Sequence, residues 1–319
     1  DRERRSSMAT PASLLLMSVL GSIGIAAGSV LILGPEDRIS LTRGAWLSVL
    51  GLIFFVSLFD LLNYVALKPL WVICFAKSIA FFYRLEYLNC VTLAYRTVSA
   101  VQALLSCITG SVVCIWSCTR NFLRSSHFMS EAYAWFGAAY FFYDIWSMYR
   151  VHSSSTVSNG HGCRLARLKD YLTKQPIIVL HHLFIGSFGF LVIVYLRGGL
   201  GDCIFGFVYL MELSTPFVSF RGILSRLKMK SSQLYIMNGL VMLVTFFFCR
   251  VVMFPYVCYL YSQLVGLPYL EAVMSLPIGC KIGITVLMLP QLYWFSLMLY
   301  GAVRVFCRRD HITKNARLS

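Results

Sequence analysis

The stretch PIIVLHHLFIGSFGFLVIVYL, residues 176–196, decides the class of fold. Apart from two adjacent histidines it is almost entirely apolar, and it exceeds the ~18 residues that a helix needs to cross the hydrocarbon core of a membrane. Polar side chains are costly in such a segment, so His181 and His182 are not expected there without a role. The stretch therefore predicts a membrane-spanning helix whose histidine pair is a candidate functional site.

Similar apolar runs recur along the chain, which has 319 residues, 58% of them hydrophobic and only 13% charged. No soluble globular domain of this size has such a composition. About eight spans are expected, at 13–33, 45–67, 97–118, 132–149, 176–196, 203–220, 234–261 and 271–300. The shorter stretch 70–83, interrupted by Lys77, is expected to be an interfacial helix. Strand-like alternation is missing, and we therefore predict an all-α, polytopic membrane protein.

The net charge of +15 is gathered in three basic clusters, at 150–174, 221–230 and 304–317. With eight spans, all three clusters fall on the same side of the membrane, and this positive-inside pattern places both termini in the cytosol. The surplus charge then orients the protein and attracts anionic lipid headgroups. No nucleic-acid partner is expected.

The N-terminal region leaves two alternatives open. The chain starts on Asp1, and if its natural start is Met8, the run 13–33 is either a retained anchor, which its length favours, or a cleaved signal peptide that would leave the N-terminus in the lumen. We divide the chain into an anchor region (1–91), one compact bundle (92–306) and a basic cytosolic tail (307–319).

The eleven cysteines are odd in number and lie mostly within the spans, which argues against a disulfide framework and against a metal site. We expect most of them to be small core residues, with Cys307 a candidate for S-acylation. In the longest connection, Leu165, Leu168 and Leu172 share a helical face among basic residues, a pattern typical of a helix lying in the membrane surface.

Ionisable side chains inside spans usually face the interior of a bundle, so each is a candidate site residue. They are Arg96, Asp144, His181, His182, Glu212, Arg250 and Lys281. Polar residues follow three helical stripes: Arg96, Ser99, Gln102 and Ser106; Tyr140, Asp144 and Ser147; Tyr209, Glu212, Thr215 and Ser219. We expect Asp144, the histidines and Glu212 to share one cavity. Pro216 leaves the Glu212 carbonyl without its helical donor, which predicts a kink there.

These residues also have structural alternatives. Arg96 either enters the bundle or snorkels to the headgroups. Asp144 and Glu212 are either site residues or members of structural ion pairs, and for Glu212 the partner would be Arg96, Arg250 or Lys281. Arg250 and Lys281 are expected in the other half of the membrane, paired with polar groups or phosphates.

Several segments together resemble a known family. They are YRTVSAVQA (95–103), YFFYDIWSMY (140–149), VLHHLFIG (179–186), MELSTPFVSF (211–220), MNGLVMLVTFFFCRVVMFPY (237–256) and LPQLYWF (289–295). They are similar to the TLC domain of translocating-chain-associating membrane proteins, ceramide synthases and the ceroid-lipofuscinosis membrane protein, in particular to the small ceramide-synthase-like family 3. The resemblance covers about 92–306. It implies a barrel-like bundle of six helices, open to the cytosol and to lipid.

The resemblance also implies an activity, in which paired histidines in a central tunnel transfer an acyl group from acyl-CoA to a sphingoid amine. Catalysis then falls on His181 and His182, with Asp144 and Glu212 as supporting acids. The residues expected to bind substrate are Arg96, Ser214, Thr215, Asn238 and Arg250. No metal or bound cofactor is expected. The expected partners are membrane lipids, acyl-CoA as co-substrate and a sphingoid base, with a homo-oligomer left open.

One segment departs from the ceramide synthases. Their motif continues with a second histidine-aspartate segment in the next helix, where this chain reads Glu212-Leu-Ser-Thr-Pro-Phe. Two hypotheses lead: an acyl-CoA-dependent N-acyltransferase that contributes to ceramide synthesis, and a non-enzymatic protein that binds, senses or transports lipids. A channel or ion transporter ranks third, because the ionisable residues cluster at one depth and do not form a path across the membrane. For the first two, the endoplasmic reticulum or the Golgi is the implied location.

Overall fold

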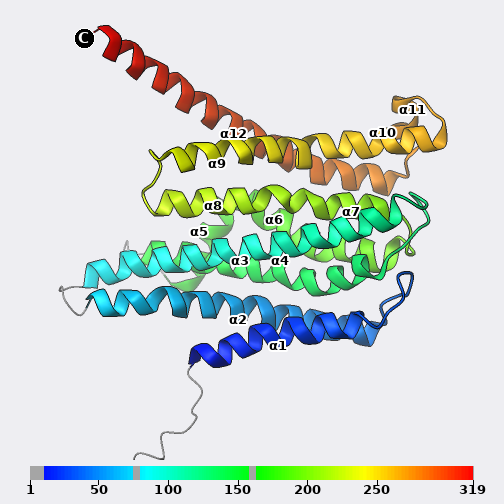
Figure 1. Cartoon of the computed structure of the whole chain (residues 1–319), viewed down its shortest axis with the longest axis horizontal. Helices are drawn as coiled ribbons and strands as arrows, with labels where there is room; N and C mark the ends of the chain where they lie inside the picture. The colour runs from blue at the N-terminus through cyan, green and yellow to red at the C-terminus, as the bar shows by residue number, and fades with distance from the viewer. Residues whose placement is uncertain (1–10, 75–79, 158–162, 319) are drawn as a thin grey trace, which may run out of the picture. The chain divides into compact units, whose positions relative to one another are not determined.

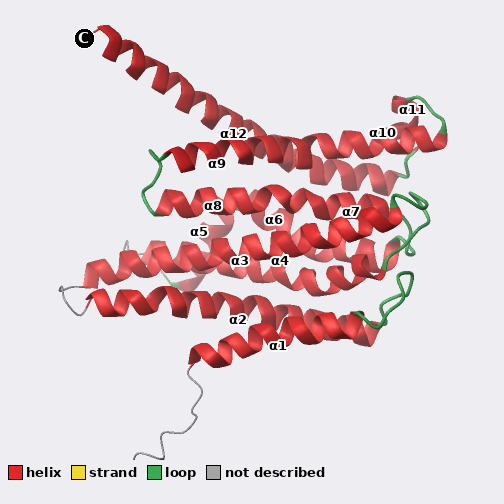
Figure 2. Cartoon of the chain, in the orientation of Figure 1, coloured by secondary structure: helices red, strands yellow, loops and turns green. Residues whose placement is uncertain are grey.

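The computed structural model describes residues 11–74, 80–157 and 163–318, which form helices joined by loops and turns and contain no strand (Figure 2). The α-helices are α1 (Pro11–Val30), α2 (Leu41–Cys74), α3 (Ala80–Ser117), α4 (Phe128–Val157), α5 (Arg164–Lys174), α6 (Pro176–Phe184), α7 (Asp202–Leu210), α8 (Thr215–Arg226), α9 (Gln233–Phe246), α10 (Met253–Val265), α11 (Tyr269–Ser275) and α12 (Ile278–Leu318) (Figure 1). The π-helical turns η2 (Ile185–Gly189), η3 (Val192–Leu196) and η5 (Phe247–Val252) and the 3-10 turn η4 (Met211–Ser214) interrupt the longer helical runs.

Seven helical segments of the described chain are long and apolar enough to cross a membrane: Pro11–Val30, Leu41–Val65, Cys90–Ser117, Pro176–Leu196, Asp202–Arg226, Gln233–Val265 and Ile278–Arg304. Each corresponds to a predicted span. The eighth predicted span, 132–149, lies in α4, which has 30 residues but is less apolar than the others. Because α4 packs against α2, α3 and α6, its side chains meet protein on several sides. The chain is thus an all-α, polytopic membrane protein.

The prediction of an interfacial helix over 70–83 is wrong for the residues that the structure describes. The first of them continue α2, which runs to Cys74, and the last belong to α3, which begins at Ala80; Lys77 lies outside the described residues. At 1.5 Å per residue the 34 residues of α2 extend about 51 Å, more than the ~30 Å of a hydrocarbon core. A helix of this length extends beyond the hydrocarbon core, so the residues near its end need not be apolar.

The chain forms two compact units, Asp1–Gly206 and Phe207–Ser319. In the first unit, α4 is the central helix and α1, α2, α3 and α6 pack on it. Gly51 makes the contact with α2 close, because a Cβ there would lie 2.2 Å from the Phe136 carbonyl oxygen. In the second unit, α9 packs against α8, and both α9 and η5 pack against α12. The predicted domain boundary at residue 91 stays a prediction.

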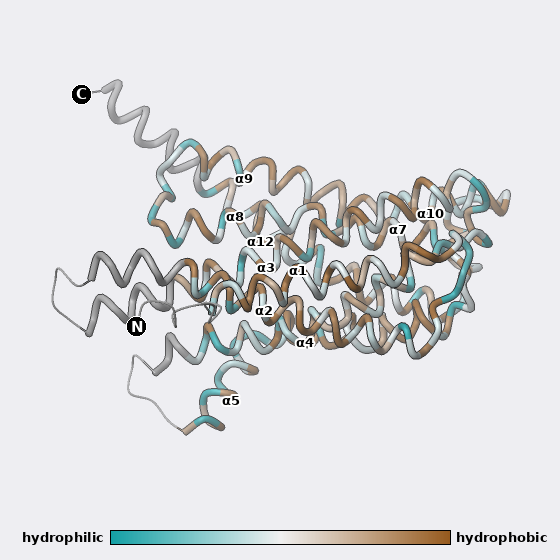
Figure 3. The backbone as a smooth tube through the Cα atoms, turned by 60° about the horizontal axis from the view of Figure 1, so that its bottom comes forward, coloured by the Kyte–Doolittle hydropathy of each residue, from teal (hydrophilic) through white to brown (hydrophobic). Residues whose placement is uncertain are grey.

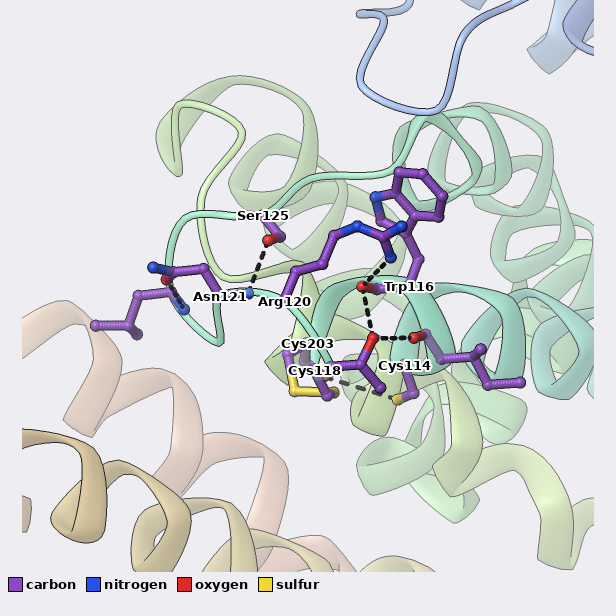
Figure 4. The surroundings of a disulfide bond; sticks show 10 residues. Cys114, Trp116, Cys118, Arg120, Asn121, Ser125 and Cys203 are labelled. Atoms are coloured by element: carbon purple, nitrogen blue, oxygen red, sulfur yellow. Dashed lines mark hydrogen bonds between the residues drawn. A yellow bond between two sulfur atoms is a disulfide. The ribbon is translucent and has the colours of Figure 1, made fainter.

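A disulfide joins Cys118, just after α3, to Cys203 in the first turn of α7 (Figure 4). The sequence argued against disulfides, and that prediction is wrong for this pair, whose separation of 85 residues gave no signal. The same end of the unit carries the ion pair between Arg197 and Asp202, and Asp202 accepts a hydrogen bond from the backbone N–H of His127 at 2.6 Å. These contacts join the α3–α4 and η3–α7 connections.

Hydropathy along the backbone agrees with a membrane location (Figure 3). The long helices are apolar over most of their length, while α5 is hydrophilic. On α5, Leu165, Leu168 and Leu172 are exposed, as the pattern of an interfacial helix requires. The residues before Pro11 and the side chain of Cys307 lie outside the part of the chain that is described, so the alternatives for the N-terminus and for S-acylation stay predictions.

Candidate functional site

The predicted polar stripe of α4 is buried inside the first unit. Tyr140, Asp144 and Ser147 are 4%, 1% and 0% exposed, because a spacing of four and then three residues returns them to one helical face. The Tyr140 hydroxyl donates a hydrogen bond to Asp144 Oδ1 at 2.9 Å. A carboxylate in an apolar interior needs such partners, because burying it alone costs several kcal/mol or more.

His182 supplies the second contact of this carboxylate. Its helix α6 starts at Pro176, which sits at the first helical position and is preorganised for it. His182 Nδ1 lies 2.9 Å from Asp144 Oδ2. The distance is that of an ion pair, but neither atom meets the angular requirement of a hydrogen bond. The imidazole Nε2 makes no hydrogen bond with a described residue, and the side chain is 14% exposed. His182 is therefore held by Asp144 at Nδ1, and the Nε2 side of its ring can contact a ligand.

His181 is placed differently from its neighbour. The centroids of the two imidazole rings lie 5.9 Å apart, and successive helical residues point about 100° away from each other. The Phe141 ring packs edge-on against His182, with 5.7 Å between the ring centroids. The contact with the α4 carboxylate that the structure shows is made by His182, which the sequence alone did not predict.

Gly186 allows α6 and its continuation to approach α4 this closely. A Cβ at this position would lie 2.9 Å from Phe141 Cβ, closer than real Cβ atoms come. The helix also changes to the π-helical turn η2 directly after Phe184. Single π-helical turns inside α-helices are frequent at functional sites, and here the turn follows the histidine pair.

The surface helix α5 is anchored beside this cluster by a buried tyrosine. The Tyr171 hydroxyl donates to the Ile145 carbonyl oxygen at 3.3 Å, and the side chain is 1% exposed. Burial raises the pKa of Tyr171 to about 12, with a smaller contribution from the negative charge of Asp144. At the surface, Asp170 contacts His152 and Lys174, and hydrogen bonds from both lower the pKa of Asp170. Sequence reasoning did not identify this anchor.

The predicted stripe on α3 also faces inward. Ser99, Gln102 and Ser106 are buried, and Gln102 and Tyr133 exchange two hydrogen bonds of 3.1 Å. The Nε of Arg96 is buried and has no hydrogen-bond partner among the described residues. The substrate-binding role predicted for Arg96 stays a prediction.

A second polar cluster lies within the second unit, around Arg250. The guanidinium is largely buried and contacts four side-chain oxygens: Ser214 Oγ at 2.8 Å, Thr215 Oγ1 at 2.7 Å, Gln291 Oε1 at 3.2 Å and Glu212 Oε1 at 3.1 Å. The Thr215 hydroxyl also donates to Glu212 Oε2 at 2.5 Å. Glu212 is therefore the ion-pair partner of Arg250, the structural alternative left open above, and whether it shares a cavity with the histidines stays a prediction.

This cluster corrects one expectation and adds one residue. Arg250 does not lie in the other half of the membrane from Glu212, because helices that start far apart in the sequence bring the two residues within ion-pair distance. Gln291, 1% exposed, was missed, although a glutamine after a proline within an apolar run is a signal of a buried polar contact. Lys281 donates to the Met274 carbonyl oxygen at 3.0 Å.

Beside Pro216 the regular α-helix is interrupted, and the Glu212 carbonyl accepts a hydrogen bond from the backbone N–H of Thr215. The predicted kink itself stays a prediction. The helical run changes to the 3-10 turn η4 at Met211–Ser214 before α8 begins at Thr215. Asn238, another predicted substrate-binding residue, is buried and donates to the Phe217 carbonyl oxygen at 2.9 Å. Among the described residues, no three His, Cys, Asp or Glu side chains gather in a way that could hold a metal ion.

Comparison with known proteins agrees with this architecture. The family model of the TLC domain matches residues 92–300, more than half of the chain. One similar relative is TLC domain-containing protein 4 of Homo sapiens, 31% identical over 124 residues, which are 38% of this chain and 47% of that protein. The match thus spans about half of the relative, and the relative is not a family 3 protein. On the strength of the domain match, this chain belongs to the TLC domain family.

Proposed function

We propose that the chain acts on membrane lipids as an acyl-CoA-dependent N-acyltransferase, with a sphingoid base as the amine acceptor. The observation that carries the proposal is the contact between His182 and the fully buried Asp144. In the proposed arrangement, the negative charge of Asp144 beside Nδ1 favours the tautomer that carries its proton on Nδ1, so that Nε2 is the basic nitrogen that general-base catalysis uses.

In the proposed step, His182 Nε2 accepts a proton from the amine as its nitrogen attacks the thioester carbonyl carbon. The C–N bond forms and the C–S bond breaks. The coenzyme A thiolate leaves and takes up the proton, so no external oxidant or reductant is needed. Asp144 stabilises the transient imidazolium, and Tyr140 holds Asp144 through its hydrogen bond. Arg96, with its buried and unpartnered Nε, is the residue best suited to bind a substrate oxygen.

The test is acyl transfer by the purified protein in liposomes, supplied with labelled acyl-CoA and sphinganine. Replacing His182 by alanine is expected to lower the rate by about 10² or more, the usual contribution of a general base. His152→Ala is the matched control, because this histidine pairs with Asp170 at the surface. Product formation that survives the double replacement of His181 and His182 by alanine would contradict the proposal.

A second candidate is a non-enzymatic protein that binds, senses or transports lipids. One observation favours it: the acid at the place of the second histidine-aspartate segment, Glu212, is engaged with Arg250. Mass spectrometry of the purified protein would then identify a bound lipid while acyl transfer stays at background. For both candidates we expect residence in the endoplasmic reticulum or the Golgi, which imaging of a tagged full-length chain can test.

A further inference from the structure

A groove in the second unit lies where α8 ends and α9 begins, with α12 along its side. Its cavity has a volume of about 90 Å³. One end is lined by Arg221, Lys230 and Tyr235, and the rest by apolar side chains such as Leu240, Leu243 and Met298. A charged end that continues into an apolar channel fits an amphiphile with an anionic head.

The cationic end is organised in advance. Arg221 Nε donates to the Tyr235 hydroxyl at 3.2 Å, and the guanidinium carbon lies 5.2 Å from the centre of that ring. No acidic side chain among the described residues forms an ion pair with Arg221 or Lys230. A fixed guanidinium next to a lysine, without a carboxylate to neutralise them, is a favourable partner for a phosphate group.

The apolar part is kept open by Gly239 in α9. A Cβ built at this glycine meets no other atom within 4 Å, so the space beside it is empty. The cavity volume of about 90 Å³ equals roughly three times the ~30 Å³ that one water occupies in the liquid, which is room for a few methylene groups. A ligand must therefore continue outside the groove, as a lipid does when the rest of its chain stays in the bilayer.

The surroundings favour the same class of ligand. Arg226 is the last residue of α8, and Lys228 lies in the α8–α9 connection. Basic residues next to a membrane span attract anionic lipids, by about 1 kcal/mol for each Lys or Arg near the surface. We propose that this groove binds an anionic phospholipid, with its phosphate at Arg221 and Lys230 and the first part of an acyl chain beside Gly239. The site does not depend on the proposed acyl transfer.

The test is binding of fluorescent phosphatidic acid to the full-length protein in nanodiscs of phosphatidylcholine, without acyl-CoA. Arg221→Gln and Lys230→Gln are each expected to weaken binding about fivefold. Gly239→Leu should weaken it at least as much, since leucine fills the channel. Gly283→Leu in α12 is the matched control, because its Cβ also meets nothing within 4 Å and it does not line the groove.

Three results would overturn the proposal: unchanged binding in all groove variants, equal binding of labelled phosphatidylcholine, or displacement of the probe by acyl-CoA at lower concentration than by unlabelled phosphatidic acid. The third result would show that the groove binds acyl-CoA in preference to phosphatidic acid. Lys230 is exposed, so Lys230→Gln decides the question even if Arg221→Gln fails to fold. If the protein binds phosphatidic acid but shows no acyl transfer, only the proposed function is contradicted.

Discussion

Replacing Glu212 by glutamine is expected to destabilise the second unit, because the change leaves a buried arginine without its carboxylate. Arg250 contacts no other acid among the described residues, and its side chain is 10% exposed. Breaking a buried ion pair costs about 3 to 5 kcal/mol. The cost here should be lower, about 2 to 3 kcal/mol, because Glu212 is 24% exposed and three neutral oxygens continue to accept from Arg250.

Each kcal/mol changes Tm by about 2 to 4 °C for a domain of 150 to 250 residues, so a cost of about 2 to 3 kcal/mol corresponds to an expected loss of about 4 to 12 °C. Thermal unfolding in detergent measures it, with specific acyl-transfer activity determined on the same preparation. Glu271→Gln is the control, because this glutamate of α11 is exposed, and its Tm should not change.

A double-mutant cycle sharpens the test. If the two side chains stabilise the fold as an ion pair, the loss of stability in the double variant Glu212→Gln with Arg250→Met should be smaller than the sum of the two single losses. The sequence alone favoured a catalytic Glu212, whereas the ion pair favours a structural one. An unchanged Tm with a hundredfold lower specific activity would refute the structural reasoning.

Two substitutions and one labelling experiment test the histidine site and its surroundings. Gly186→Ala should push α6 away from α4 and lower acyl transfer by up to about 10², since a shift near 1 Å can cost that much; Gly189→Ala, whose Cβ makes only ordinary contacts of 3.7 Å or more, is the control in the same assay. Tyr140→Phe removes a hydrogen bond to the Asp144 carboxylate, worth about 1.5 to 3 kcal/mol, and should lower Tm as well as activity. Backbone N–H groups at the start of α5 lower the pKa of exposed Cys163, so maleimide labelling of this thiol should persist to lower pH than for a free cysteine peptide; an identical pH profile would contradict this.

Much of the fold could be predicted because a membrane imposes a simple rule on composition. Apolar runs of sufficient length identified every candidate span, and the polar stripe of Tyr140, Asp144 and Ser147 identified the buried face of α4. The predicted span 132–149, which lies in α4, is the one that is not among the seven candidate spans of the described residues. A helix surrounded by other helices needs no apolar surface for lipid, so its hydropathy says less about its position.

The partners of the polar residues could not be predicted, because they depend on how helices distant in sequence pack. His181 and His182 are equally polar, and only the rotation of α6 decides that His182 contacts Asp144. Likewise, Glu212 had three candidate cations, and the turns η4 and η5 determine that Arg250 is the one. Helical spacing gives the face of a residue, but a contact needs the rotation and depth of two helices.

Two features that arise from different physics support the same orientation for the first unit. The Cys118–Cys203 bond lies at the end where α3 passes to α4, and disulfides persist in oxidising compartments. The basic helix α5 lies at the opposite end of α4, where the positive-inside rule places the cytosol. His182 is six residues past the start of α6, about 9 Å from the end of that helix next to α5. Acyl-CoA is a water-soluble anionic thioester, and in this orientation it would reach the histidines from the basic side of the membrane by the shorter path.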